Sequence, residues 1–129
     1  MQKIITGWLN LVMLILVTAC NGDTVGSGND IELTQQQVRN GQMVYNDQCA
    51  RCHDPGMVGP QLQASTLAVY GTAQGLFEYT RQTMPQDAPG TLSEQEYWDV
   101  TAHMMQETGL LPGDTGLGPA NAPEIEFNP

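Results

Sequence analysis

The 129-residue chain carries 14 acidic and 4 basic residues, for a formal charge of −10. This length suits one domain with tails rather than two domains. The acidic balance argues against nucleic-acid binding, because such proteins need a basic surface to neutralise phosphates. The cysteine count is three, an odd number that does not suit a framework of paired disulfides.

Residues 1–20 have the pattern of an export signal. Lys3 is followed by an apolar run and then by Thr-Ala-Cys, which ends at Cys20. The run is short for a helix that must cross a bilayer core of roughly 30 Å. The four residues Val-Thr-Ala-Cys resemble the lipobox of bacterial lipoproteins. That resemblance implies a signal peptide at 1–19 and a lipid attached to Cys20.

A lipid on Cys20 predicts a membrane-anchored protein in the bacterial periplasmic space. Residues 20–31 are small, polar and rich in glycine, so they are expected to form a flexible tether. The residue after the cysteine is Asn21 rather than aspartate, and this favours the outer membrane over the inner one. An ordinary signal, or an uncleaved anchor with an incidental cysteine, remains the alternative.

The first predicted helix begins at Thr34 and runs to about residue 49. Thr34 and Gln37 have the spacing of a capping box, which marks a helix start. Gly41 lies inside this helix, where glycine costs about 1 kcal/mol relative to alanine. A glycine at this position therefore indicates that another element packs closely against the helix.

Two more helices are predicted further along the chain. The first covers residues 73–83 and ends before Pro85, because the residue that precedes a proline disfavours helix. The second runs from about 94 to 108, after a capping box formed by Ser93 and Glu96. Apolar residues recur at helical spacing in both segments.

The remaining segments, 54–72 and 85–92, contain many glycines and prolines and are predicted to be irregular. No alternating run is long enough to indicate a sheet, so the class is all-α. The helical body spans 32–111, and 112–129 is expected to be an extended, Pro/Gly-rich tail. A body of this size buries only roughly 60 % of its unfolded surface, so it needs another source of apolar contact.

Cys49, Cys52 and His53 form the pattern C-x-x-C-H, the attachment signature of c-type haem. Thiols three residues apart on one helical turn can reach two vinyl groups, and the histidine can then bind the iron. A thioredoxin-like site would need a βαβ pattern, which is absent. A zinc site would need four ligands, and only His103 remains as a fourth candidate.

Over about residues 36–108 the chain resembles the small monohaem class I cytochromes c. Each matching motif is weak alone, but their order and spacing together are specific. The motifs are Gly41 with Tyr45, the C-x-x-C-H pattern at 49–53, Gly59-Pro60-Gln61-Leu62, Met84-Pro85, and Leu-Ser-x-x-Glu-Tyr at 92–97.

This resemblance implies an all-α fold in which three to four helices surround one covalently bound haem c. It also implies roles for individual residues. The Pro60 carbonyl would accept the second ring proton of His53, Leu62 would pack on the haem, and Met84 would bind the iron opposite His53.

The sequence favours Met84 as the distal ligand on independent grounds. Met43 precedes the motif, and Met57 follows it by only four residues. Met104 and Met105 lie on the apolar faces of the last predicted helix. Met84 ends a helix in an irregular loop, far from the motif in sequence, and is free to approach the opposite face of the haem.

His103 departs from the resembling family, which often has an aromatic residue there. The position predicts a packed side chain near Gly41, with a role as iron ligand or pH switch as the alternative. Arg81 is a candidate partner for a haem propionate or for a nearby carboxylate.

With both axial positions filled, the predicted function is one-electron transfer rather than catalysis. The expected donors and acceptors are a periplasmic dehydrogenase or a respiratory complex, with basic docking patches that suit this acidic, lysine-poor chain. The alternative is a labile distal methionine in a gas or peroxide sensor or enzyme. A structural lipoprotein without haem is a third possibility.

Overall fold

The computed structural model describes residues 26–113 and 115–128, and in this part of the chain it contains helices but no strand. The all-α class predicted from the sequence is therefore confirmed. None of these helices is both long and apolar enough to cross a membrane. The elements in chain order are α1 (Gly26–Val44), the π-helical turn η1 (Tyr45–Cys49), α2 (Ala50–His53), α3 (Ala64–Ala68), α4 (Ala73–Thr83), α5 (Glu94–Glu107) and the 3-10 turn η2 (Ala122–Glu124).

Helix α1 begins at Gly26, so the predicted start at Thr34 is wrong. The Thr34 hydroxyl does not cap the helix but donates a hydrogen bond to the Asp30 carbonyl one turn earlier, at 2.8 Å. Threonine can make this bond within a helix, which is why its presence does not by itself mark an end. Residues 26–31 are thus helical, although the sequence assigned them to the tether. The predicted signal peptide and Cys20 lie outside the described residues and stay predictions.

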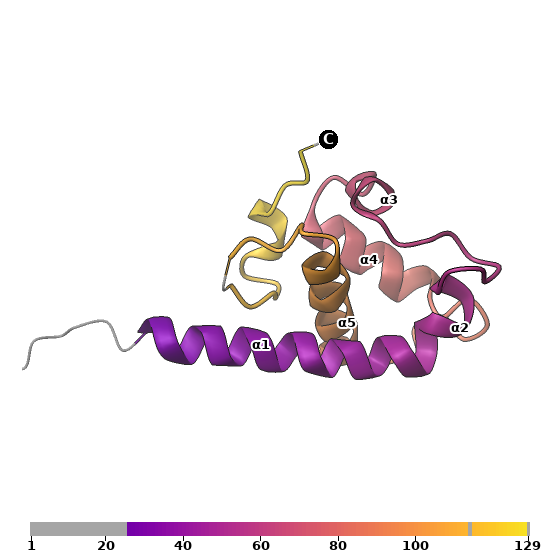
Figure 1. The fold of residues 1–129 in the computed structure, drawn as a ribbon. Helices are drawn as coiled ribbons and strands as arrows, with labels where there is room; N and C mark the ends of the chain where they lie inside the picture. The colour runs from indigo at the N-terminus through magenta and orange to yellow at the C-terminus, as the bar shows by residue number, and fades with distance from the viewer. Residues whose placement is uncertain (1–25, 114, 129) are drawn as a thin grey trace, which may run out of the picture.

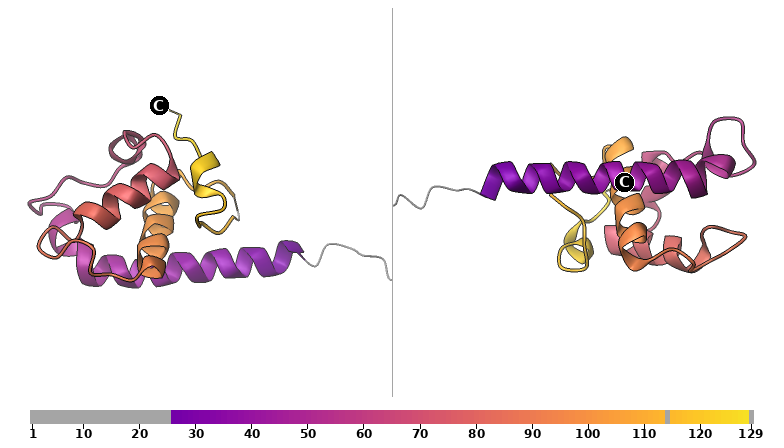
Figure 2. Two further views of the ribbon diagram at one scale, coloured as in Figure 1. Left: turned by 180° about the vertical axis from the view of Figure 1, so that it is seen from behind. Right: turned by 90° about the horizontal axis from the view of Figure 1, so that it is seen from below.

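Helices α1 and α5 cross (Figures 1 and 2), and Gly41 of α1 lies where it meets Asp99 and His103 of α5. A Cβ atom at this glycine would overlap the Asp99 carbonyl and would lie 2.8 Å from the Cβ of His103. The close packing inferred from a glycine inside a helix is confirmed, and so is the predicted place of His103 beside it. This crossing joins the segment that leads into Cys49 to the last long helix.

The predicted bounds of α4 and α5 agree with the structure. Thr72 caps α4 by accepting a hydrogen bond from the Gly75 amide at 3.0 Å, and the helix ends before Met84. Ser93 and Glu96 form the expected capping box at the start of α5. Beyond this helix Gly109 has φ +73°, a conformation that glycine adopts without strain.

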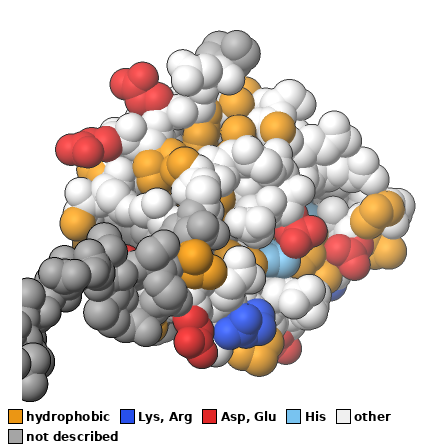
Figure 3. Space-filling model, turned by 60° about the vertical axis from the view of Figure 1, so that its left-hand side comes forward, with side chains coloured by type: hydrophobic (Ala, Val, Ile, Leu, Met, Phe, Trp, Pro, Cys, Tyr) orange, Lys and Arg blue, Asp and Glu red, His pale blue; other side chains and the backbone are white. Residues whose placement is uncertain are grey.

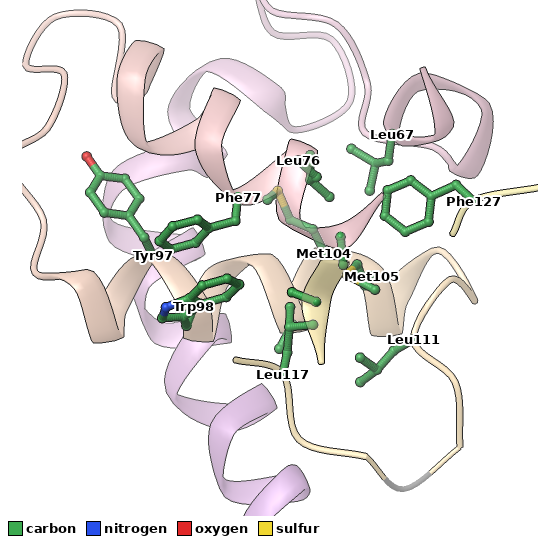
Figure 4. Packing of buried hydrophobic residues seen from close by; sticks show 13 residues of the cluster. Leu67, Leu76, Phe77, Tyr97, Trp98, Met104, Met105, Leu111, Leu117 and Phe127 are labelled. Atoms are coloured by element: carbon green, nitrogen blue, oxygen red, sulfur yellow. The ribbon is translucent and has the colours of Figure 1, made fainter. Parts of the chain in front are cut away.

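Between these helices, α3 was not predicted, because its five residues are too few to show a helical period. It nonetheless brings Leu67, which is 2 % exposed, into the main core. Phe77 and Trp98 stack in that core with ring centroids 3.5 Å apart, so they join α4 to α5 (Figure 4).

The C-terminal segment is not an extended tail, contrary to the expectation. It folds back beside α1 and α5 (Figures 1 and 2), where the Gln37 side chain donates to the Leu117 carbonyl at 2.8 Å and accepts from the Leu117 amide at 2.7 Å. Thr72 and Glu126 form an isolated antiparallel bridge. Within the described part of residues 112–128, three side chains are buried, namely Leu117, Ala122 and Phe127, and Leu111 just before the segment is buried too. The segment therefore supplies part of the core that the short helical body lacks.

Candidate functional site

The two motif cysteines lie on one helical turn, beyond the end of α1. Cys49 closes η1, and Cys52 lies in α2, which continues the same helical path. Both are free and half-buried. Burial raises the pKa of the Cys49 thiol to about 11, although the positive charge of Arg51 opposes this. Before any haem is attached, Cys49 is therefore a protonated thiol at neutral pH, unlike the low-pKa thiolates of redox-active C-x-x-C sites.

His53 is oriented by the loop that follows α2. Its Nδ1 lies 2.8 Å from the Pro60 carbonyl, the contact expected from the sequence resemblance. Because the carbonyl can only accept, Nδ1 carries the proton and Nε2 is the nitrogen with a free lone pair. A histidine that ligates a metal is commonly held in this way by its second nitrogen.

Gly59 makes this orientation possible, a role that the sequence analysis did not assign. Its amide donates to the Cys52 carbonyl at 2.7 Å. A Cβ at this position would lie 2.6 Å from that carbonyl oxygen and 3.2 Å from His53 Nδ1. The position of a glycine just before Pro60 was the available signal. Leu62, further along the loop, is partly buried against the core.

Met84 follows the last residue of α4 and is held at both backbone polar groups. Its amide donates to the Thr80 carbonyl at 2.8 Å, and its carbonyl accepts a hydrogen bond from the Tyr97 hydroxyl, also at 2.8 Å. The Met84–Pro85 peptide is cis, and Pro85 is buried. The part of Tyr97 in fixing this residue could not be read from the sequence, since the two positions lie on different elements.

The other methionines of the described residues lie in different surroundings. Met43 and Met57 are 64 % and 50 % exposed, whereas Met104 and Met105 are buried in the core. Met84 is half-buried, at the start of the loop that joins α4 to α5. This placement agrees with the choice of Met84 made from the sequence, although the ligation itself stays a prediction.

His103 lies in the α1–α5 crossing rather than with Cys49, Cys52 and His53. Its ring lies 5.5 Å from the Tyr45 ring, centroid to centroid, and its Nδ1 is buried with no hydrogen-bond partner among the described residues. Burial lowers the pKa of His103 below its usual 6.5, and the nearby Glu107 carboxylate opposes that shift. The residue is therefore neutral in the folded protein at pH 7.

This burial predicts an acid-dependent loss of stability. The unfolded chain takes up a proton on His103 near pH 6.5, whereas the folded chain resists it, so stability falls as pH drops below about 6.5. The slope for one such proton is at most about 1.4 kcal/mol per pH unit. We expect urea unfolding of His103→Phe to have a smaller pH dependence than wild type between neutral pH and pH 5. Equal slopes in the two proteins would contradict the prediction.

No group of three or more histidine, cysteine, aspartate or glutamate side chains comes together as a metal site within residues 26–113 and 115–128. His103, the fourth candidate for a zinc ligand, lies at the α1–α5 crossing. The residues instead fit a c-type haem. They supply two free thiols on one turn, and an imidazole held through Nδ1 with the Nε2 lone pair free.

Comparison with known proteins agrees with this geometry. Residues 36–104 match a family model described as subunit III of cbb3-type cytochrome c oxidase. The chain is 23 % identical to photosystem II extrinsic protein V of Acaryochloris marina over 124 residues, which cover 75 % of this chain and 76 % of the relative. It is 28 % identical to the protein of the same name from Gracilaria tenuistipitata over 76 residues, which cover 53 % of this chain and 46 % of the relative. No solved structure matches the chain.

Proposed function

The chain belongs to the cytochrome c family of this matched model, and from that premise we propose that it is a one-electron carrier with His53 and Met84 as its axial ligands. Membership of this family indicates a covalently bound haem c and a general role in electron transfer. The haem supplies an iron centre that changes its oxidation state by one electron. The assignment of the two ligands, of a carrier rather than a catalyst, and of the partners is our proposal.

The observation that carries the proposal is the contact between His53 Nδ1 and the Pro60 carbonyl. This contact fixes the tautomer and the ring direction of His53, as an axial ligand requires. Cys49 and Cys52 would hold the haem permanently, one thioether each. On the other side, Thr80 and Tyr97 hold the backbone of Met84. A methionine sulfur opposite a histidine favours the reduced state and leaves no open position for a substrate.

We expect the reduced wild-type protein to resist carbon monoxide, because a methionine-ligated site has no free position. Met84→Ala should bind carbon monoxide fully and lose the weak red charge-transfer band of the oxidised form. Met57→Ala is the matched control, since Met57 is half exposed and outside the proposed ligand set. Absorption spectra of both redox states before and after adding the gas give the answer. If wild type binds carbon monoxide as readily as Met84→Ala, the gas-binding alternative replaces the carrier.

We also propose that the chain is a periplasmic lipoprotein, anchored through Cys20 after removal of residues 1–19. The Val-Thr-Ala-Cys sequence supports this anchor, and Asn21 favours the outer membrane. Such a mature chain retains 14 acidic residues against three arginines and no lysine. The face in Figure 3 carries more acidic than basic side chains. We therefore expect partners with basic docking patches, because opposite charge raises encounter rates.

The partner that we propose is a periplasmic dehydrogenase or a respiratory complex. The shared name of the two relatives, an extrinsic protein of photosystem II, supports a partner that is itself a redox assembly.

A further inference from the structure

One ion pair links the segment that carries Cys49, Cys52 and His53 to the loop that carries Met84. The Arg51 Nη2 and Asp87 Oδ1 atoms are 2.6 Å apart, although the two residues are 36 positions apart in sequence. Arg51 lies between the two motif cysteines on α2. The Arg51–Asp87 contact is the one ion pair found in residues 26–113 and 115–128.

The segment 84–93, which joins α4 to α5, is called here the Met84 loop. Other contacts fix its start. The Met84 backbone is bonded to α4 through Thr80 and to α5 through Tyr97. Further along, the loop forms a hydrogen-bonded turn, in which the Ala88 amide donates to the Pro85 carbonyl at 2.9 Å. Asp87 belongs to this turn, so its bond to Arg51 ties the middle of the loop to α2.

The other two arginines of the folded part are used differently. Arg39 donates to Gln36 on its own helix. Arg81 lies over the Phe77 ring, with its guanidinium carbon 6.0 Å from the ring centroid. Arg51 is thus the arginine that pairs with a carboxylate from another segment, and that segment is the one that begins with Met84.

We propose that Arg51 and Asp87 form a clasp that keeps the Met84 loop closed against α2, and that Arg51 and Asp87 are therefore positioning residues for the distal ligand. This inference rests on the proposed ligation by Met84. For an external ligand to replace Met84, the loop must move, and that movement breaks the clasp. Because both side chains are more than half exposed, at 54 % and 63 %, the bond is partly screened by solvent.

The clasp predicts weaker protection of the iron when either charge is removed. Imidazole is a suitable probe at slightly alkaline pH, because it is then neutral and its binding does not respond to a simple change in protein charge. In the oxidised holoprotein, Asp87→Asn and Arg51→Gln should each raise imidazole affinity about 1.5- to 5-fold, the range expected for an exposed ion pair. High salt should raise the imidazole affinity of the wild-type protein toward that of the variants, because salt screens the ion pair.

Three further variants separate a clasp from a general charge effect. Glu78→Gln and Arg39→Gln remove the same charges from exposed positions on α4 and α1, and they should leave imidazole affinity unchanged. The double variant Arg51→Gln/Asp87→Asn should match either single variant, because the same bond is lost in all three. If the effects of the two single variants add in the double variant, or if the controls respond equally, the clasp is overturned.

The experiment also distinguishes this inference from the proposed function. The red charge-transfer band of the oxidised wild-type protein reports methionine ligation before any imidazole is added. If the band is absent, both the ligation and the clasp are wrong. If the band is present but neither Arg51→Gln nor Asp87→Asn changes imidazole affinity, the clasp alone is wrong and the carrier stands.

Discussion

Replacing both Cys49 and Cys52 with serine is expected to abolish covalent haem attachment. Serine keeps the size and the helical turn but has no thiol to form a thioether, so haem should be lost when the protein is denatured in acidified organic solvent. Each single variant should keep one linkage. The measurement is the intact mass, which should fall by one haem in the double variant, together with haem staining on a denaturing gel.

Cys20→Ser is the matched control, since it removes the remaining cysteine of the chain outside the motif. It should keep its haem and lose only the incorporation of labelled fatty acid, if the proposed lipid site is right. A double variant of Cys49 and Cys52 that still carries the mass of a haem, in cells that mature c-type cytochromes, would contradict the assignment of this motif.

Gly41→Ala is expected to destabilise the folded protein by about 2 kcal/mol. Alanine gains up to about 1 kcal/mol of helix propensity over glycine. Against that gain, its Cβ would overlap the Asp99 backbone carbonyl and press on His103. Backbone atoms cannot rotate aside, so α1 and α5 must separate, and overpacking of this kind costs about 3 kcal/mol at the upper end of its usual range. Urea unfolding of the holoprotein measures the difference.

Gly118→Ala provides a control for the added methyl group, because no atom lies within 4 Å of a Cβ built at Gly118. Its stability should stay within about 0.5 kcal/mol of wild type, as for most surface substitutions. If Gly41→Ala proves as stable as Gly118→Ala, the two helices do not need a glycine at their crossing, and the close packing is not what determines the residue at 41.

The candidate site was predicted from sequence where its chemistry is local. The spacing of Cys49, Cys52 and His53 places two thiols and an imidazole on adjacent positions of one turn, whatever surrounds them. The contact from His53 to Pro60 spans seven residues, and the resemblance to class I cytochromes c identified it. In contrast, Gly59, Tyr97 and Asp87 act through contacts with other segments of the chain, and the sequence did not assign these contacts.

The sequence by itself determined the all-α class, the bounds of α4 and α5, the cap at Ser93 and the haem-attachment motif. Each depends on residues within one or two turns, so neighbouring side chains and backbone groups decide the outcome. Only the tertiary structure decided the early start of α1, the existence of α3 and the docking of the C-terminal segment on Gln37. The last two depend on contacts with residues distant in sequence, whereas within α1 the Thr34 hydroxyl bonds the Asp30 carbonyl of the same helix. The segment after Pro112 has no helical or strand period, and its few apolar residues become buried only because α1, α4 and α5 leave a surface that they cover.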